Sequence, residues 1–374
     1  MDFSQNATHA ELSALLRRIL ADKAGPDRLA RLESENLEFD PDLWKAMASA
    51  GVLAAAAPGE AGGDDLGLTG QCSVLTELGR AVAPVPYLDT IVLGAGAIAG
   101  FGSAGQVSRW AAPAVAGDLI IAVALAEPGG AGPERPATRA ERADDGSWRL
   151  TGVKTTVPAG DEAGLFLVPA ATGGGTAVFA IGRSGPGLTV STQRTTGGAG
   201  TVQLDLAGAQ ASQDQMIGQP GSALPRWLAD RATVGRCALQ LGVTERALEL
   251  TAEHARTREQ FGRPIGAFQA VAQRLADAYI DVEAIRLTLW QAAWRLEEGR
   301  PAGQEIATAK FWAADGGHRV AHTAVHVHGG MGIDISHPLH RYFTAAKASE
   351  FALGGATDQL RRLGALLAET ARAT

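Results

Sequence analysis

The sequence predicts an α+β fold in which two helical segments enclose a segment of strands. Apolar residues recur at helical spacing in the first and last parts of the 374-residue chain, and short apolar runs separated by turn residues fill the middle. The length also exceeds the roughly 250–300 residues at which a single core stops growing. We therefore expect three units: an N-terminal helical domain at 1–118, a middle β domain at 119–215 and a C-terminal helical bundle at 216–374.

The first unit is predicted to be helical throughout. From residue 11 to about residue 90 the apolar residues follow the helical period, interrupted by turn residues such as Pro58-Gly59. A second helical stretch at 94–116 ends at Gly117-Asp118. The middle unit then begins with the apolar run 119–125.

The middle unit is predicted to consist of short strands. Asp145-Gly146 separates runs 138–143 and 147–152, and this dipeptide supplies the positive φ angles of a two-residue hairpin turn. Further short apolar runs follow at 165–168, 177–181, 188–190 and 201–206. Because no helix-length segment lies between these runs, they favour an antiparallel sandwich or barrel over a parallel dinucleotide-binding sheet.

Helical periodicity returns after Gly221 and continues to the end of the sequence. Its clearest case is a row of apolar residues at alternating steps of four and three: Val271, Leu275, Ala278, Val282, Ile285, Leu289, Ala292 and Leu296. Charged residues such as Asp281 and Arg286 fall outside this row. The row predicts the seam of a helix bundle, which Gly299-Arg300-Pro301 ends.

Composition excludes several classes of partner. The net charge of −7 provides no positive field for nucleic acid. The longest apolar stretch, 52–58, is far shorter than the roughly 20 residues of a membrane-spanning helix, and the first residues resemble no signal peptide. We expect a cytoplasmic protein without a membrane partner. Cys72 and Cys237 lie far apart, so neither a disulfide framework nor a cysteine metal site is predicted.

The most specific string runs from Ala255 to Gln269. Arg258 offers a planar fork of donors to a phosphate, Gln260 offers hydrogen bonds to a polar ring edge, and Phe261 offers a flat face. Without further context, the alternative is a helix connector with solvated arginines.

The string resembles the signature R-x-Q-F-G-x-P-I-x-x-F-Q of the acyl-CoA dehydrogenase family. Other segments match in family order: Ala126-Glu127-Pro128-Gly129 is similar to T-E-P-x-x-G, Leu150-Thr151-Gly152-Val153-Lys154 to L-x-G-x-K, and residues 326–332 to Q-x-x-G-G-x-G. The resemblance covers nearly the whole chain. It implies an N-terminal helical domain, a middle antiparallel β-barrel, a C-terminal four-helix bundle, and FAD bound between subunits.

The resemblance also implies which residues contact the cofactor. The positions that match the family's adenosine and pyrophosphate site, in a flavin held mainly by the neighbouring chain, are Arg258, Gln260, Phe261, His326, Gly329, Gly330 and Gly332. His326 stands where the family has glutamine. Backbone amides without Cβ atoms approach a pyrophosphate closely, which suits the glycines. The alternative for the glycine cluster is a bend between two helices.

The half that would face the isoalloxazine ring departs from the family pattern. Ala126 replaces a threonine, and Val157-Pro158-Ala159 lacks the usual hydroxyl donor. Thr155 and Thr156 are candidates to replace that donor, or are ordinary strand residues.

The catalytic base also departs from the pattern. In the family a carboxylate removes the α-proton of a CoA thioester while the β-hydrogen passes to the flavin as hydride. The matching segment, 353–362, has leucine or glycine in the slot for the glutamate, and the alternative slot holds Ala232. Asp230 and Glu350 lie nearby and are weak candidates, each interpreted as a solvated helix charge. Asp230 lies about 200° around the helix from the alternative slot.

Four histidines, His318, His322, His326 and His328, are spaced at steps of four, four and two. No cysteine or carboxylate completes a ligand set, so we predict solvated or bundle-capping roles and no metal site.

The combined pattern favours a partner subunit that lacks the catalytic base in an α2β2 acyl-CoA dehydrogenase. The arm at 332–343 is similar to that of actinobacterial members that are paired in this way and oxidise CoA thioesters of sterol side chains. A homologous chain would supply the base, and an electron-transfer flavoprotein would accept the electrons. Two alternatives stay open: a homomeric dehydrogenase that uses Asp230 or Glu350, and a silent CoA-ester binding protein or scaffold.

Overall fold

A computed structural model describes residues 7–130, 132–197 and 200–373. The N-terminal part is helical, as predicted. Its elements are α1 (Ala7–Lys23), α2 (Pro26–Ser34), α3 (Pro41–Ser49), α4 (Val52–Ala55), η1 (Gly59–Ala61), α5 (Gly67–Arg80), η2 (Leu88–Ala95), α6 (Gly96–Phe101), α7 (Ala104–Gln106), η3 (Val107–Ala111) and α8 (Ala112–Ala116). Gly117 ends α8 with a φ of 88°, which a residue with a side chain rarely adopts.

The middle part is one mixed sheet. Its strands are β1 (Ile121–Val123), β2 (Arg139–Arg142), β3 (Trp148–Val157), β4 (Leu165–Thr172), β5 (Gly175–Gly182), β6 (Leu188–Thr192), β7 (Val202–Ala211) and β8 (Met216–Ile217). They lie in the order β6-β7-β3-β2-β4-β5-β8, with β1 beside β4. The predicted Asp145-Gly146 hairpin joins β2 to β3.

The sheet is not purely antiparallel, because β4 runs parallel to both β1 and β2. Short spacing in sequence indicates antiparallel pairing only for strands that a hairpin joins. The β2–β3 hairpin lies between β1 and β4 in the chain, so their pairing is a tertiary arrangement.

The C-terminal part is a bundle of long helices. Its elements are α9 (Leu224–Thr257), β9 (Glu259–Gln260), β10 (Arg263–Pro264), η5 (Ile265–Ala267), α10 (Gln269–Glu297), α11 (Gly303–His328), η6 (Gly329–Ile333), α12 (Leu339–Phe351) and α13 (Ala356–Ala373). The predicted seam is confirmed at its centre, where Ala278, Val282, Ile285, Leu289 and Ala292 are buried. Asp281 is also buried, and its carboxylate forms an ion pair with Arg319.

Two glycines fix the crossing of α5 and α9. A Cβ atom on Gly79 would lie 2.1 Å from the carbonyl oxygen of Leu239, and one on Gly242 would lie 1.9 Å from that of Thr76. The largest apolar cluster runs through the N-terminal helices, β1, β4 and α9 to α11. The fold class is therefore confirmed as helical, β and helical parts in that order, while the exact domain limits stay a prediction.

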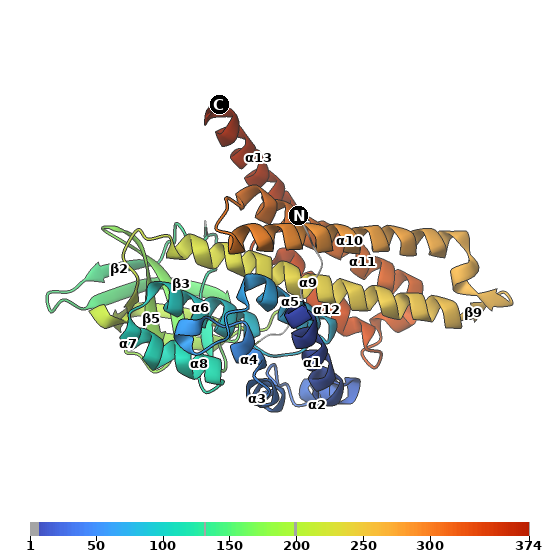
Figure 1. Cartoon of the computed structure of the whole chain (residues 1–374), viewed down its shortest axis with the longest axis horizontal. Coiled ribbons are helices and arrows are strands. Elements are labelled where there is room, and N and C mark those ends of the chain that lie inside the picture. Colours follow the sequence, from blue (N-terminus) through green and yellow to red (C-terminus); the bar gives the residue numbers. More distant parts are fainter. Residues whose placement is uncertain (1–6, 131, 198–199, 374) are drawn as a thin grey trace.

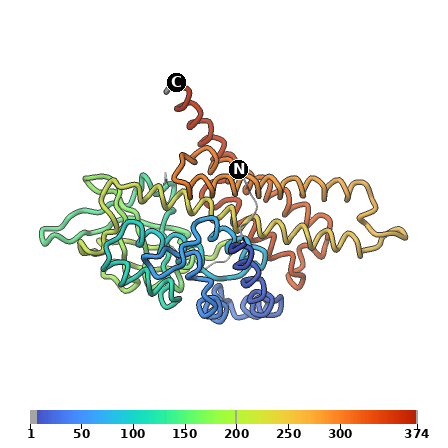
Figure 2. Tube along the Cα trace, viewed as in Figure 1, coloured from blue at the N-terminus to red at the C-terminus, as the bar shows by residue number. Residues whose placement is uncertain are grey.

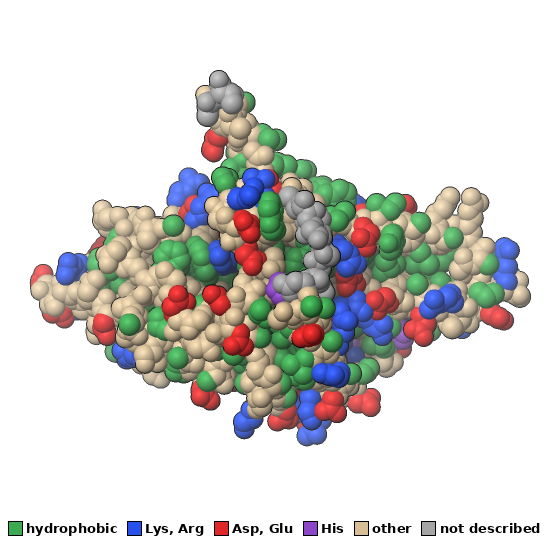
Figure 3. Space-filling view, in the orientation of Figure 1, with side chains coloured by type: hydrophobic (Ala, Val, Ile, Leu, Met, Phe, Trp, Pro, Cys, Tyr) green, Lys and Arg blue, Asp and Glu red, His purple; other side chains and the backbone are tan. Residues whose placement is uncertain are grey.

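The molecule is elongated, with the sheet near one end of its long axis and the β9–β10 hairpin at the other (Figure 1). The chain trace shows α9 and α10 side by side along the arm that carries this hairpin (Figure 2). On the face drawn in Figure 3, acidic and basic side chains are interspersed. Among the described residues, no helix combines the length and apolar character that a membrane span requires.

Candidate cofactor site

The string from Arg258 to Phe268 forms a hairpin that projects from the end of α9. Arg258 leaves the helix with extended backbone, and its carbonyl accepts a hydrogen bond from the N–H of Ile265 at 2.8 Å. Gln260 pairs with Arg263, and the turn between them places Phe261 at φ 53° and Gly262 at φ 75°. Phe261 is 92% exposed. An aromatic ring exposed to this degree leaves its face open to another molecule.

The glycine turn follows α11. Gly329 has φ 62° and ψ −137°, a conformation open to glycine, and Gly332 packs so closely that a Cβ atom would lie 2.9 Å from the Cα atom of Val325. Gly330, in contrast, has open space where a Cβ atom would be. His326 is exposed in the last turn of α11. The turn therefore presents backbone amides at a surface that a ligand can approach.

The described residues fit the adenosine and pyrophosphate end of FAD. Arg258 and Gln260 are exposed donors, Phe261 offers a free ring face, and the turn at Gly329 and Gly330 offers an accessible backbone. Which of these residues contact the cofactor remains a prediction.

The segment that would face the isoalloxazine ring is occupied by internal contacts. Lys154, which is fully buried, donates to Glu127 at 2.7 Å. Burial opposes ionisation of Glu127, but Lys154 and hydrogen bonds at residues 137 and 138 outweigh burial and hold the pKa of this carboxyl at about 2. The Thr155 hydroxyl shares a hydrogen bond with the side chain of Gln193. Of the two hydroxyls considered for the flavin, that of Thr155 is therefore already engaged, and Thr156 donates its backbone N–H to Gln193.

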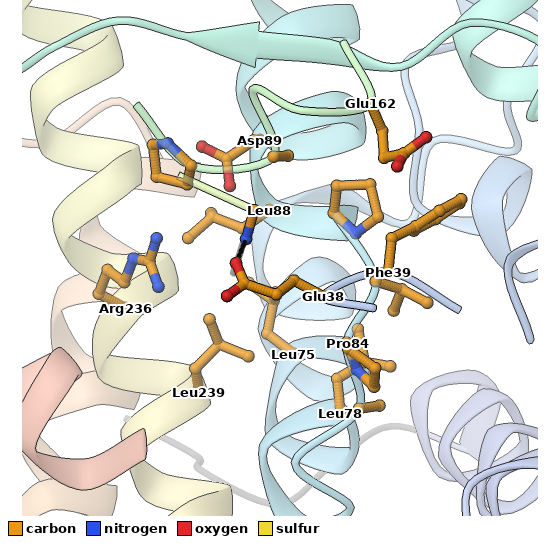
Figure 4. A pocket seen from close by; sticks show the side chains of 16 residues that line it. Glu38, Phe39, Leu75, Leu78, Pro84, Leu88, Asp89, Glu162, Arg236 and Leu239 are labelled. Atoms are coloured by element: carbon orange, nitrogen blue, oxygen red, sulfur yellow. Dashed lines mark hydrogen bonds between the residues drawn. The ribbon is translucent and has the colours of Figure 1, made fainter. Parts of the chain in front are cut away.

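A cavity of about 140 Å³ lies beside this segment, where the three parts of the chain meet (Figure 4). Leucine and proline side chains form much of its wall, but ionisable groups also line it. They are Glu38, Asp89, Glu162 and Arg236. Glu38 accepts a hydrogen bond from the backbone of Gly200, and burial raises the pKa of Asp89. Four ionisable groups around a small space make it a poor container for an apolar acyl chain.

Both candidate bases form ion pairs. Asp230 accepts from Arg362 at 3.2 Å and lies 3.4 Å from Arg226. Glu350 lies 2.5 Å from the ammonium of Lys347 and 3.1 Å from Nδ1 of His318. Each carboxylate is therefore already engaged by side chains of its own chain. The base slot itself contains Leu353 at φ 59° and Gly354 at φ 93°.

The histidines separate into two groups. His318 and His322 lie together, 4.2 Å between ring centroids, on the side of α11 that faces α12. His328 is buried instead, and its ring stacks on His254 at 4.3 Å. No metal-binding group of three is found among the described side chains.

Sequence reasoning missed the charged cavity and the stack of His254 on His328. The cavity residues come from five separate segments, and no spacing in the sequence connects them. His254 did carry a signal, because it lies four residues before Arg258, in the last turn of the predicted helix.

Comparisons with known proteins agree with this geometry. Residues 6–118 match the model of the acyl-CoA dehydrogenase N-terminal domain, and residues 224–366 match the C-terminal domain. The chain is 48% identical to acyl-CoA dehydrogenase FadE27 of Mycobacterium tuberculosis over 99% of this chain and 100% of that protein.

Two solved structures are also similar. A chain of the ChsE4-ChsE5 complex from Mycobacterium tuberculosis has a TM-score of 0.94 and 49% identity, with 99% of each chain covered. A chain of the Tcur3481-Tcur3483 steroid acyl-CoA dehydrogenase variant has a TM-score of 0.91 and 40% identity, covering 97% of this chain and 98% of that one. This chain therefore belongs to the acyl-CoA dehydrogenase family, whose members are FAD-dependent oxidoreductases that act on CH–CH bonds.

Proposed function

We propose that this chain is the partner subunit without a catalytic base in an α2β2 acyl-CoA dehydrogenase that acts on the CoA thioester of a sterol side chain or a similarly bulky acyl group. The chain supplies adenosine and pyrophosphate contacts to FAD, and the homologous partner supplies the base and the isoalloxazine pocket. The substrate class rests on the relatives, which include a steroid acyl-CoA dehydrogenase and a two-component complex. An electron-transfer flavoprotein is the proposed electron acceptor.

One observation carries the proposal that the cofactor contacts are made to another chain. Arg236 lines the cavity from within α9, and Arg258, the residue directly after α9, begins the hairpin. They are separated by about six helical turns, or about 33 Å along the axis. The hairpin residues therefore serve a cofactor whose reactive end lies outside this chain's own cavity.

The absence of a base rests on separate contacts. Leucine or glycine stands in the family slot, and the two nearby carboxylates are paired, Asp230 with Arg362 and Glu350 with Lys347. These ion pairs disfavour the alternative of a homomeric enzyme that uses Asp230 or Glu350.

Exposed apolar surface supports an assembly of several chains. On α10 the side chains of Tyr279, Ile280 and Leu287 are 59%, 62% and 51% exposed. Large apolar side chains grouped on one helix are typical of a subunit contact.

In the proposed assembly this chain orients the cofactor and the partner performs the proton transfer. Arg258 neutralises phosphate charge, the glycine turn donates backbone N–H groups, and Phe261 covers a ring face. Bound FAD supplies the acceptor for the β-hydride.

The first experiment is the visible absorption spectrum of the purified chain, alone and after co-expression with a homologous dehydrogenase chain. We expect flavin bands in the co-purified complex and none in the isolated chain. Full flavin content and brisk acyl-CoA oxidation by the isolated chain would contradict the proposal. A colourless sample under both conditions would instead favour a binding or scaffold protein. The cytoplasmic location stays a prediction.

A further inference from the structure

The two segments proposed to hold the adenosine end of FAD leave different helices. The hairpin follows α9, and the glycine turn follows α11. No backbone hydrogen bond between the two segments is found in the described part of the chain. Their relative placement must therefore come from side chains.

A stack of imidazoles joins them. The rings of His254 and His328 have centroids 4.3 Å apart and planes only 19° from parallel. His254 lies in the last full turn of α9, and its carbonyl accepts the N–H of Arg258 at 2.8 Å. His328 is the last residue of α11, directly before Gly329. The stack thus connects the residue that anchors the hairpin with the residue that begins the glycine turn.

His328 is held firmly on its own helix. Its Nδ1 lies 2.8 Å from the carbonyl oxygen of Ala324, and because a carbonyl only accepts, Nδ1 carries the proton. The residue is 7% exposed. His337, from the loop after the turn, covers His328 with a centroid distance of 5.2 Å.

We propose that His254 and His328 are positioning residues for the cofactor: their stacked rings, covered by His337, hold the β9–β10 hairpin and the glycine turn in the relative placement that binds the adenosine and pyrophosphate of FAD. The inference rests on the proposed function, since it assigns a role to the same cofactor contacts.

Electrostatics gives the stack a pH dependence. Burial lowers the pKa of His254, and Arg258 and His337 lower it further. Burial also lowers the pKa of His328. The hydrogen bond to the Ala324 carbonyl raises this pKa, whereas His254 and His337 lower it, and the net shift is downward. Asp334 and His340 lie beside His337, in and after the loop that covers the stack.

Both rings are therefore neutral in the folded protein at pH 7. An imidazole whose pKa is lowered by folding destabilises the fold when the pH falls below its ordinary value of about 6.5. Acidification should loosen the stack and weaken the binding of FAD.

The test is the dissociation constant of FAD for the co-purified complex, measured by flavin fluorescence at pH 8 and pH 6. His254→Ala removes the stacked ring, and we expect binding about three- to tenfold weaker at pH 8, the range of one aromatic pair. His254→Phe keeps a flat ring that does not titrate, so it should retain affinity at pH 8 and lose less affinity at pH 6 than the unmodified complex. His322→Ala, on α11 with His328 but outside the stack, is the matched control.

Unchanged binding in His254→Ala, or an undiminished loss at pH 6 in His254→Phe, would overturn the positioning role. Arg258→Ala separates this failure from failure of the proposed function. If Arg258→Ala weakens FAD binding and His254→Ala does not, only the stack is wrong. If neither variant affects binding, the assignment of the hairpin to the cofactor is wrong. Thermal unfolding of each complex reports whether a variant has lost its fold.

Discussion

The two segments predicted to contact the flavin have opposite characters in this chain. At the far end of the bundle, Phe261, Arg258 and Gln260 extend into solvent with few contacts within the chain. Beside the sheet, Lys154, Glu127 and the threonine hydroxyl at 155 are engaged by neighbours within the chain. The first set of residues is open to contact with another molecule, whereas the second is engaged within the chain. In this way one cofactor site can be divided between two chains, each of which contributes a different part of the contacts.

The largest expected effect separates stability from flavin binding. Lys154→Met leaves the ionised carboxylate of Glu127 buried without its partner, and we expect the free energy of unfolding to fall by about 3–5 kcal/mol. Adding Glu127→Gln should restore much of the loss. Denaturant unfolding of the isolated chain measures both, and a loss below about 1 kcal/mol would contradict the assignment of this half to the core.

The same pair predicts a pH dependence. Because the pKa of Glu127 is lowered to about 2 from 4.5, its contribution to stability is present above about pH 4.5 and is lost as the pH falls toward 2. In Glu127→Gln this part of the acid transition should disappear. An unchanged acid-unfolding curve would show that other groups control it.

A variant in the β9–β10 hairpin should affect flavin binding and leave stability nearly unchanged. Arg258→Ala removes a charge-assisted contact to phosphate, and we expect FAD to bind the complex about 10- to 100-fold more weakly while stability stays within about 0.5 kcal/mol. Arg256→Ala, at an exposed position two residues earlier, is the control. Equal effects of the two variants would mean that general charge, and not the geometry of the hairpin, attracts the cofactor.

Two glycines of the turn after α11 separate an effect on the fold from an effect on flavin binding. Gly332→Ala forces the turn away from Val325, so flavin content and stability should both fall, the latter by about 1–3 kcal/mol. Gly330→Ala meets open space and should preserve the fold of the isolated chain. It reduces flavin content only if the backbone there lies against the cofactor. Normal flavin content in both variants would remove the turn from the cofactor site.

The smallest effects are expected at the two candidate bases. Asp230→Asn and Glu350→Gln should change the turnover of the complex by less than about threefold, since loss of a true general base costs on the order of 10²-fold or more. Steady-state acyl-CoA oxidation provides the measurement. A loss of 10²-fold in either variant would revive the homomeric alternative.

Local patterns were sufficient for most of the fold. The seam of α10, the β2–β3 hairpin and the end of α8 at Gly117 follow from spacing, from the Asp-Gly dipeptide and from glycine's freedom of φ. The resemblance of residues 255–269 and 326–332 also predicted the family and its cofactor. Each of these features depends on residues close together in the chain, so a single sequence is enough to predict it.

The tertiary structure decided what the two halves of the site are free to do. The parallel pairing of β1 with β4, the cavity around Arg236 and Asp89, and the stack of His254 on His328 join residues that are tens of residues or more apart. The sequence predicted solvated side chains for Asp230 and Glu350. In the structure Asp230 pairs with Arg362 of α13, and Glu350 pairs with Lys347 of its own helix. Burial and pairing depend on which elements meet in space, and this is the information that a linear pattern lacks.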